Sequence, residues 1–458
     1  MPALPLHGIR VLDLSRVFAM PYAGAYLADL GAEVIKVDTH HSQFMESTRQ
    51  ATGPFPGNDP GELYFERGGT FQTLNRGKRS LTLDLRSESA RAVVKELVAV
   101  CDVVLENFTP RVMARFELDY PNLRAHKPDL IMVSNTGYGH SGPWTNFGAM
   151  ASALEPTHGT GAFMGYLEAD AEGRRVAGHL PNKMGNSYTD FLATWTALGA
   201  VMACLLHRAR TGRGMWVDLA MYQVGVSFVG EGLLDFAFNG RRTRRLGNRH
   251  QTMCPHGCYP CEGADSWVTL AVRDDADWSA LCRVLDQSGI HLADDPRFSD
   301  PLTRRRHQDE LDDIIAGWTS TQGQYPLMDR LQAVGVPAGP VLNARQLLAD
   351  PQFHERGFFE SVQHSRETGL GRREYIGRGW KLSENNLCIR GPAPRMGEAN
   401  SYVLHEVLGR TESDISELHR EGVTGESPVG GGPPSAVPLE RQVELGWIVE
   451  RDEGFLPR

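Results

Sequence analysis

The sequence has little of what marks secreted, membrane or nucleic-acid-binding proteins. Its 458 residues include seven cysteines, too few for a disulfide framework in a chain of this length. Lys and Arg number 47 against 56 Asp and Glu, and no long basic run occurs, which argues against a nucleic-acid partner. No apolar stretch is expected to span a bilayer, and the N-terminus lacks the pattern of a signal peptide. We therefore expect a cytoplasmic protein with no membrane partner.

Several motifs of catalysis and cofactor binding are also missing. There is no Gly-x-Ser-x-Gly elbow and no Walker loop, and the glycines between 159 and 165 do not directly follow a clear strand. Cys254, Cys258 and Cys261 are irregularly spaced and have no second ligand pair downstream, so a small-residue turn is favoured over a zinc site. The sequence thus predicts no metal.

What the chain does have is an alternation of apolar strands and helices. Buried strands are expected at residues 9–14, 34–37, 103–105 and 130–133, with helices over 21–30 and 90–100. This alternation predicts βαβ units with a parallel sheet, hence an α/β fold. Ligands of such sheets bind at the carboxyl ends of strands, which here carry Ser15-Arg16, Asp38, Glu106-Asn107-Phe108 and Ser134 to Gly137.

Asp190 stands at the head of an apolar helix that runs to Leu206 and ends in a Thr-Gly-Arg-Gly turn at 211–214. A carboxylate there is stabilised as the anion by free N–H groups and by the positive end of the helix dipole. It could serve as a nucleophile that takes an acyl group as a mixed anhydride. The local alternative is an ordinary helix N-cap, for which Asp is a favoured residue.

Basic residues suggest two further places for an anionic ligand. The segment from Asn75 to Ser80 suits a polyphosphate, although a solvated basic turn fits the local sequence equally well. Arg111 and Arg115 lie one turn apart on a helix that follows a strand end, where backbone N–H groups favour an anion. The polar, Gly- and Pro-rich residues 40–69 are interpreted as a long surface loop.

Together these segments resemble the class III CoA-transferases, the formyl-CoA transferase type or CaiB/BaiF family. The resemblance extends from about residue 6 to about residue 425. It is carried, in order, by Gly8 to Arg16, Leu27 to Val37, Asn75 to Leu85, Val104 to Phe108, Val133 to Gly139 and Arg210 to Gly214. It implies a Rossmann-like large domain with a parallel sheet, a small α+β domain and an interlocked dimer.

The resemblance also implies domain boundaries. The large domain would be discontinuous, with residues 1–225 and 336–424, and the small domain would cover 226–335. After Gly422 the chain is rich in Gly, Pro and Ser up to Val437, so 425–458 is expected to be a flexible linker and a loosely attached tail.

Site residues follow from the resemblance position by position. Asp190 matches the catalytic aspartate, and Glu155 falls near the position of the reacting carbonyl. Positions that match CoA contacts are Phe18, Ala19, Leu83, Arg86, Asn107, Phe108, Arg115 and Ala151. The implied reaction moves CoA from an acyl-CoA donor to a carboxylic acid through an aspartyl anhydride and an aspartyl-CoA thioester. It needs no cofactor beyond CoA, and the assembly would be a homodimer or a hetero-oligomer with a related subunit.

Departures from the family pattern leave alternatives open. Met20 and Thr39 replace a glycine and a CoA-binding arginine, and no four-glycine loop occurs near Gly247, so oxalate and formate are not expected as substrates. Phe18, Met20 and Met150 suggest an apolar wall and a less polar acid. An α-methylacyl-CoA racemase would need a second base, but Met150 stands at the histidine position and His158 is displaced. A non-catalytic partner subunit is the other alternative.

Overall fold

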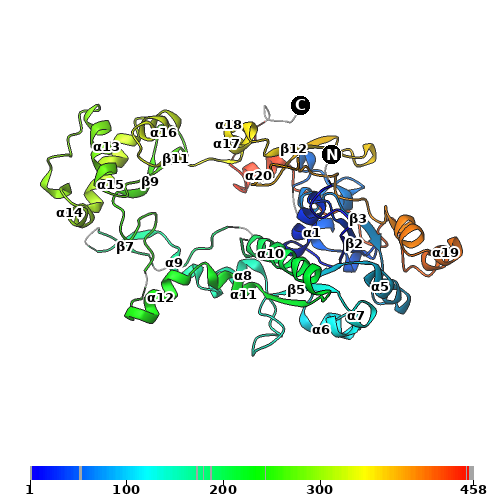
Figure 1. Cartoon of the computed structure of the whole chain (residues 1–458). Helices are drawn as coiled ribbons and strands as arrows, with labels where there is room; N and C mark the ends of the chain where they lie inside the picture. Colours follow the sequence, from blue (N-terminus) through cyan, green and yellow to red (C-terminus); the bar gives the residue numbers. More distant parts are fainter. Residues whose placement is uncertain are drawn as a thin grey trace. The chain divides into compact units, whose positions relative to one another are not determined.

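The computed structural model describes residues 3–50, 54–171, 174–178, 180–185, 188–242, 244–449 and 451–452. It divides the chain into two compact units, both discontinuous (Figure 1). The first unit contains residues 1–154, 185–227 and 351–458, and the second contains 155–184 and 228–350. The second unit therefore includes more than the 226–335 expected from the sequence, because 155–184 and 336–350 group with it.

The first unit is built on a six-stranded sheet. Its strands are β1 (Arg10–Asp13), β2 (Glu33–Asp38), β3 (Arg79–Thr82), β4 (Val103–Glu106), β5 (Ile131–Thr136) and β8 (Trp216–Ala220). The order is β3-β2-β1-β4-β5-β8, and every neighbouring pair is parallel. This is the order of a doubly wound Rossmann-type sheet, in which the strand order reverses between β1 and β4. The predicted α/β fold is confirmed.

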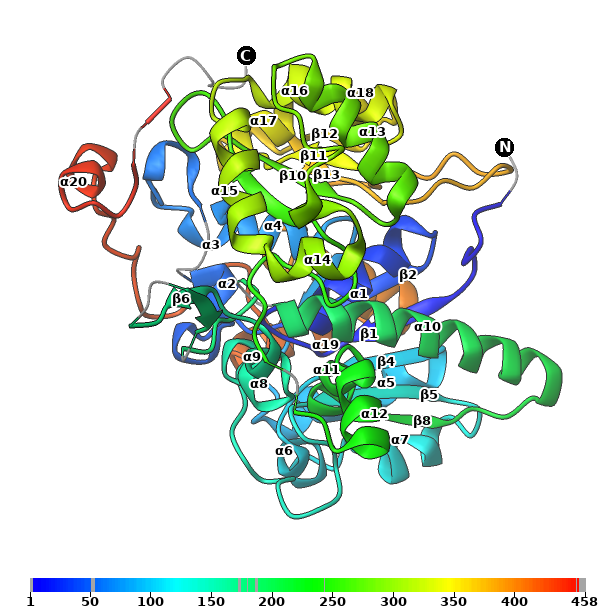
Figure 2. The ribbon, with the colours of Figure 1, turned by 90° about the vertical axis from the view of Figure 1, so that its left-hand side faces the viewer.

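Helices cover both faces of this sheet, each through an apolar face. One core contains residues of α5 (Glu88–Val100), α7 (Tyr120–His126) and the C-terminal segment around Val403. The other core contains residues of α1 (Ala19–Asp29) and α10 (Tyr188–Thr211), which pack against each other (Figure 2). Further helices of this unit include α3 (Tyr64–Arg67), α4 (Gly69–Asn75), α6 (Pro110–Arg115), α11 (Met221–Ser227), α18 (Pro351–Glu355), α19 (Glu412–Arg420) and α20 (Leu439–Glu444), with the hairpin β12 (Phe359–Gln363) and β13 (Arg372–Ile376).

Helix α10 is longer than the sequence analysis predicted, and the turn after it leads into β8, a strand that was not expected. The helix has 24 residues and a mean hydropathy of 1.5 over an 18-residue window, so by length and composition it could cross a membrane. This corrects the expectation that no stretch is long and apolar enough. Ala193, Ala197 and Val201 of α10 lie in the core beside α1, as in the core helix of a globular unit.

The beginning of the C-terminal segment is attached to the first unit by hydrogen bonds. Gly425 N–H bonds to Thr82 Oγ1 at 2.9 Å, and the Thr82 hydroxyl donates to Gly425 O at 2.6 Å. Val429 N–H donates to His40 O at 2.8 Å. Residues 425 and 429, at the start of the segment 425–458, are therefore fixed near the ends of β2 and β3, whereas the sequence indicated a flexible linker.

The second unit combines a small antiparallel sheet with helices. The sheet order is β11 (Ala338–Pro340), β10 (Trp267–Ala271) and β9 (His256–Pro260). The helices that contribute to its core are α13 (Asp275–Asp286), α15 (Gln308–Thr319) and α16 (Gln324–Ala333). Helix α14 (Pro301–Arg306) packs on this core through Arg304, whose guanidinium lies 4.9 Å from the Trp278 ring centroid. This unit also contains α9 (Thr160–Phe163), α12 (Gly230–Asn239), α17 (Ala344–Ala349) and the hairpin β6 (Leu167–Ala169) and β7 (Arg175–Ala177), while α8 (Ala151–Thr157) spans the boundary.

Candidate functional site

A pocket of about 450 Å³ lies at the carboxyl ends of β1, β4 and β5 in the first unit. It includes the point where the strand order reverses, the usual ligand site of such sheets. Its lining brings together Asp190 and four of the residues that the resemblance connects with CoA, namely Phe18, Asn107, Phe108 and Ala151. Among the described residues that line the pocket there is no histidine.

Asp190 is the third residue of α10, since the helix already begins at Tyr188. It therefore lies inside the first turn, where N–H groups are free of intrahelical partners, and is not the N-cap of the local alternative. The Thr194 hydroxyl, one turn later, donates to both Asp190 O and Ala19 O, at 2.9 and 2.8 Å. These bonds connect the first turn of α10 to α1, so Ala19 positions the helix through its carbonyl group.

The loop after β1 is clamped in a strained conformation beside this pocket. Val17 has a φ of 69°, which is unfavourable for a β-branched residue. Asn107 holds the preceding residue, because its amide accepts from Arg16 N–H at 2.8 Å and donates to Arg16 O at 2.7 Å. Buried Glu46 accepts from Val17 N–H at 3.3 Å. Asn107 thus shapes the backbone that carries Phe18 into the pocket.

Asn135 is a pocket residue that the sequence analysis placed at a strand end but did not select. Its Oδ1 is buried and has no hydrogen-bond partner among the described residues. A buried acceptor without a partner is costly unless a ligand supplies a donor. Its position directly after a buried strand was the available signal.

A second pocket, of about 230 Å³, adjoins the first through Phe108, which lines both. Three predicted CoA contacts, Leu83, Arg86 and Arg115, line it together with Arg16 and Thr39. The Arg86 guanidinium lies 4.3 Å from the Phe44 ring centroid and binds Asp84 at 2.7 Å. Arg115 and Arg16 form no ion pair with a described residue, so the pocket favours anions.

The basic segment before β3 has a structural role. Lys78 is buried and bonds to Asp13 Oδ2 and Pro21 O, both at 2.7 Å. Burial lowers the pKa of Lys78 to about 8. Buried Arg76 pairs with Asp29 at 2.9 Å. These residues precede β3 and are therefore not at its carboxyl end. Their side chains are buried in ion pairs, so the segment is neither the phosphate site nor the solvated turn that the sequence suggested.

The remaining predicted residues lie in different environments. Met20 is fully buried in the core, so it is not part of a substrate wall, whereas Met150 is 73% exposed and lines the pocket of Asp190. Glu155 and His158 are buried and belong to the second unit. Glu155 accepts from Met184 N–H at 3.1 Å.

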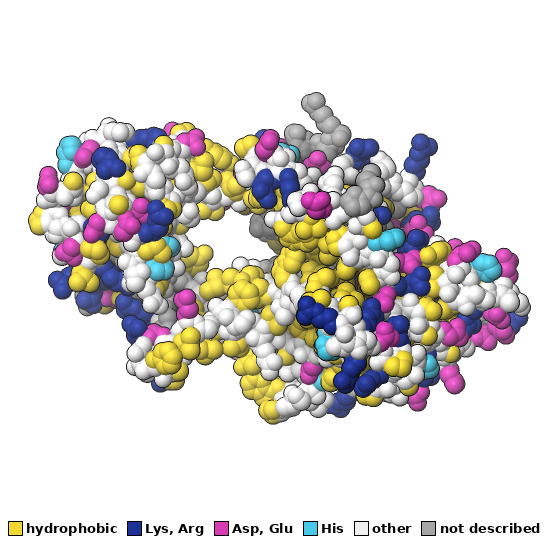
Figure 3. All heavy atoms as spheres, in the orientation of Figure 1, with side chains coloured by type: hydrophobic (Ala, Val, Ile, Leu, Met, Phe, Trp, Pro, Cys, Tyr) yellow, Lys and Arg dark blue, Asp and Glu magenta, His cyan; other side chains and the backbone are white. Residues whose placement is uncertain are grey.

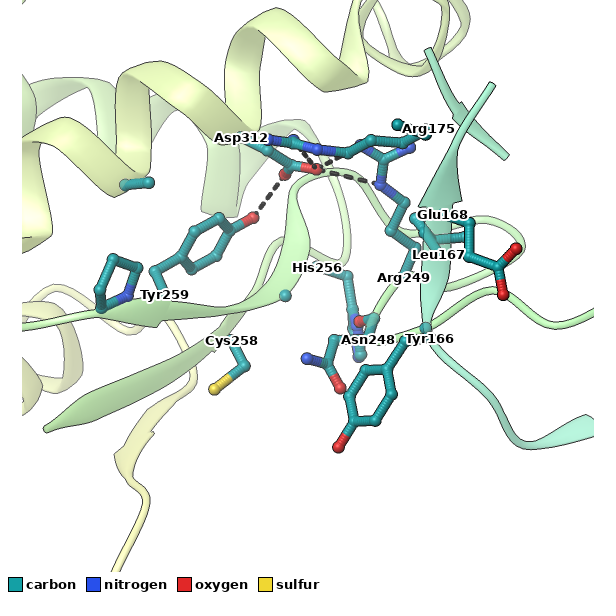
Figure 4. A pocket seen from close by; sticks show the side chains of 15 residues that line it. Tyr166, Leu167, Glu168, Arg175, Asn248, Arg249, His256, Cys258, Tyr259 and Asp312 are labelled. Atoms are coloured by element: carbon teal, nitrogen blue, oxygen red, sulfur yellow. Dashed lines mark hydrogen bonds and ion pairs between the residues drawn. The ribbon is translucent and has the colours of Figure 1, made fainter. Parts of the chain in front are cut away.

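The second unit has a pocket of its own, of about 490 Å³, between β6, β7, β9 and α15 (Figure 4). Its charged groups pair with one another: Arg249 bonds to Asp312 at 2.7 Å and to Asp309, and the Tyr259 hydroxyl donates to Asp312 at 2.7 Å. Burial raises the pKa of Asp312 despite these bonds. Cys258 lines this pocket, but no cluster of three metal-ligating side chains exists in the described part of the chain.

Comparisons with known proteins identify the family of the chain. The model of CoA-transferase family III matches residues 6–400. The chain is 33% identical to the succinate–glutarate CoA-transferase of Agrobacterium fabrum over 404 residues, which cover 88% of this chain and 96% of the relative. It is 34% identical to the succinyl-CoA:mesaconate CoA-transferase of Haloarcula hispanica over 423 residues, which cover 89% and 99%.

Solved structures give the same result. A CaiB/BaiF family protein from Brucella suis has a TM-score of 0.76 at 28% identity, and the match covers 89% of this chain and all of that one. The chain belongs to CoA-transferase family III. It is an enzyme of the class that the sequence motifs predicted, a transferase of coenzyme A.

Proposed function

We propose that this enzyme moves CoA from an acyl-CoA to a carboxylic acid with Asp190 as the covalent nucleophile. The observation that carries the proposal is the position of Asp190 in the first turn of α10, in a pocket that shares the lining residue Phe108 with an arginine-lined pocket. The first would hold the thioester, and the second the phosphates of CoA.

The reaction runs in four balanced steps. A carboxylate oxygen of Asp190 attacks the donor thioester carbon, the C–S bond breaks, and a mixed anhydride and CoA thiolate form. The thiolate attacks the Asp190 carbonyl carbon, which releases the donor acid and leaves an aspartyl-CoA thioester. The acceptor carboxylate then displaces the thiolate to give a second anhydride. Attack of the thiolate on the acceptor acyl carbon forms the new acyl-CoA and regenerates Asp190.

The chain's own residues would bind and orient CoA along this path. Arg16, Arg86 and Arg115 suit its phosphates, Phe108 separates the two pockets, and the unpartnered Asn135 Oδ1 suits an amide N–H of the CoA arm. The role that the resemblance gives to Glu155 stays a prediction. We propose no cofactor other than CoA.

The acids are proposed to be small dicarboxylic acids. Succinate, glutarate and mesaconate appear in the names of the relatives, and all three carry two carboxylates. The earlier expectation of a less polar acid relied partly on Met20, which is buried in the core.

A homodimer is proposed as the working assembly. Helix α12 exposes Leu233, Leu234, Phe236 and Phe238. Figure 3 shows hydrophobic side chains gathered over this helix. A cluster of exposed apolar side chains is typical of a surface covered by a partner chain. Light scattering would give the mass of the assembly, and a monomer with full activity would contradict this part of the proposal.

The test is covalent trapping combined with substitution. Asp190→Asn keeps the shape of the side chain but removes the nucleophile, so transfer should fall by at least about a thousandfold while CoA still binds. Hydroxylamine added during turnover should leave a hydroxamate on the Asp190 peptide of the wild type, detected by mass spectrometry. Glu412→Gln, at an exposed first-turn carboxylate of α19, is the matched control and should change neither result. Substantial transfer by Asp190→Asn would overturn the mechanism.

A further inference from the structure

A third cavity of the first unit is not used by the proposed chemistry. This groove of about 540 Å³ lies between the segment 54–74 and the hairpin strand β13. Phe18 lines it and also lines the pocket of Asp190. The Phe18 ring lies 5.0 Å from that of Phe191, the residue next to Asp190. The groove and the nucleophile's pocket therefore share one wall.

Two arginines line the groove without a carboxylate partner, and we call it the Arg67 groove. Arg67, the last residue of α3, forms no hydrogen bond and no ion pair through its guanidinium with any described residue, and its Nε is buried. Arg373 of β13 donates to the carbonyl of Arg372 at 3.0 Å and forms no ion pair within the described residues. A buried guanidinium nitrogen without an acceptor is unfavourable unless a ligand supplies one.

The backbone leaves room for the Arg67 guanidinium close to the hairpin. A Cβ on Gly61 would lie 2.8 Å from Arg67 Nη1, and a Cβ on Gly369 would lie 3.9 Å from the same atom. Gly369 belongs to the turn that leads into β13, so the guanidinium reaches the element that carries Arg373. The two cations therefore face one groove.

The rest of the lining is mainly apolar, with one exposed anion. Pro54, Phe55, Pro56, Leu74, Leu370 and Ile376 form most of the apolar lining. Glu374 is the carboxylate among the lining residues, so the two arginines leave a net positive charge. Such a surface suits a short carbon chain that ends in an anion.

We propose that the Arg67 groove binds the remote carboxylate of a dicarboxylic substrate while its reacting carboxyl group lies at Asp190. The inference rests on the proposed function, since it names the acid on which Asp190 acts. A guanidinium matches a carboxylate by paired charge-assisted hydrogen bonds. A monocarboxylic acid of equal length leaves both arginines without an acceptor, and a site built around a polar group rejects the analogue that lacks it.

The experiment compares two acceptor acids of equal chain length, glutarate and pentanoate, with the same acyl-CoA donor. Arg67→Gln and Arg373→Gln remove one charge each. Arg372→Gln is the matched control, because Arg372 is the exposed neighbour on β13 and does not line the groove. The values of kcat/KM are measured for each acid, and calorimetry measures glutarate binding to the enzyme with free CoA present.

The wild type should prefer glutarate over pentanoate by roughly a hundredfold. Each groove variant should lower kcat/KM for glutarate roughly 10- to 100-fold and for pentanoate less than about twofold. Equal loss for both acids, no preference in the wild type, or the same loss in Arg372→Gln would overturn the inference. If the wild type transfers CoA to no acid, the proposed function fails, and glutarate binding then decides the inference: weaker binding in both groove variants supports it, and unchanged binding rejects it.

Discussion

The Arg67 groove of the first unit and the pocket of the second unit shown in Figure 4 are similar in size, about 540 and 490 Å³, and each contains two arginines. They differ in what surrounds the guanidinium groups. In the second unit Arg249 binds Asp309 and Asp312, and Arg175 binds Asp313. In the first unit Arg67 and Arg373 have no such partner among the described residues. Cavity volume therefore does not indicate which site can bind an anion; the pairing of its charges does.

The difference originates in the sequence of the elements that form each wall. Helix α15 carries Asp309, Asp312 and Asp313 at i, i+3 and i+4, so its carboxylates share one face. The walls of the Arg67 groove come from Pro- and Leu-containing segments and from β13, which contributes Glu374. The arginines of the second unit thus stabilise its fold, and those of the first are available to a ligand.

The largest expected effect is on stability, where Arg249 of the second unit and Arg67 of the first unit should differ. Arg249→Met removes the nearer cation of partly buried Asp312 and leaves it only Arg175, whose Nη1 lies 3.9 Å away, so we expect the free energy of unfolding to fall by about 2 kcal/mol. Arg67→Met breaks no ion pair and should change it by less than about 0.5 kcal/mol. Urea unfolding measures both. Equal destabilisation by the two variants would contradict the comparison.

The sequence predicted the scaffold of the site better than its electrostatics. Strand ends and helix starts are local patterns, so the parallel sheet, the position of Asp190 and the strand-end residues Asn107 and Phe108 could be inferred. Ion pairs join residues that are distant in the sequence. Arg49, for example, is buried between Asp38 and Glu66, within residues interpreted as a surface loop.

For the same reason Arg67 could not be found from its neighbours in the sequence. Its environment depends on the turn at Gly369, some 300 residues away. The opposite mistake was made with Arg76 and Lys78. Their basic segment suggested a ligand site, but Arg76 pairs with Asp29 and Lys78 pairs with Asp13. Whether a charge is paired is decided by tertiary structure, which a one-dimensional pattern does not contain.

A smaller effect, on glutarate affinity, is expected when the negative charge of Glu374 is removed from the lining of the Arg67 groove. Glu374→Gln leaves both arginines and increases the positive charge of the lining, so glutarate should bind about threefold more tightly. Because the site is open to solvent, the gain should shrink at high salt. Calorimetry at two salt concentrations measures it. The matched change in the second unit, Glu168→Gln, should leave glutarate binding unchanged; weaker binding by Glu374→Gln would contradict the assigned charge balance.

The smallest expected effect is a change in the pKa of His364. It tests whether the positive charge of Arg373 is uncompensated when no substrate is bound. His364 is buried beside the hairpin, and its Nε2 lies 2.9 Å from the Tyr375 hydroxyl oxygen. Burial, and after it the charge of Arg373, lowers the pKa of His364 to about 4. Arg373→Gln should therefore raise the pKa of His364, which an NMR titration of its imidazole measures, whereas Arg372→Gln should leave it in place.

The lowered pKa of His364 should also make the stability of the protein depend on pH. An imidazole whose pKa is lower in the folded state than its ordinary value near 6.5 binds fewer protons there than in the unfolded chain, so acidification from about pH 6.5 towards pH 4 destabilises the fold. Arg373→Gln should weaken this dependence, because the folded-state pKa rises towards the unfolded value. A carboxylate bound in the groove should also raise the pKa of His364, as the substitution does, because it compensates the charge of Arg373. If neither raises the pKa of His364, then the charge of Arg373 is already compensated, and the contrast between the two arginine pairs does not hold.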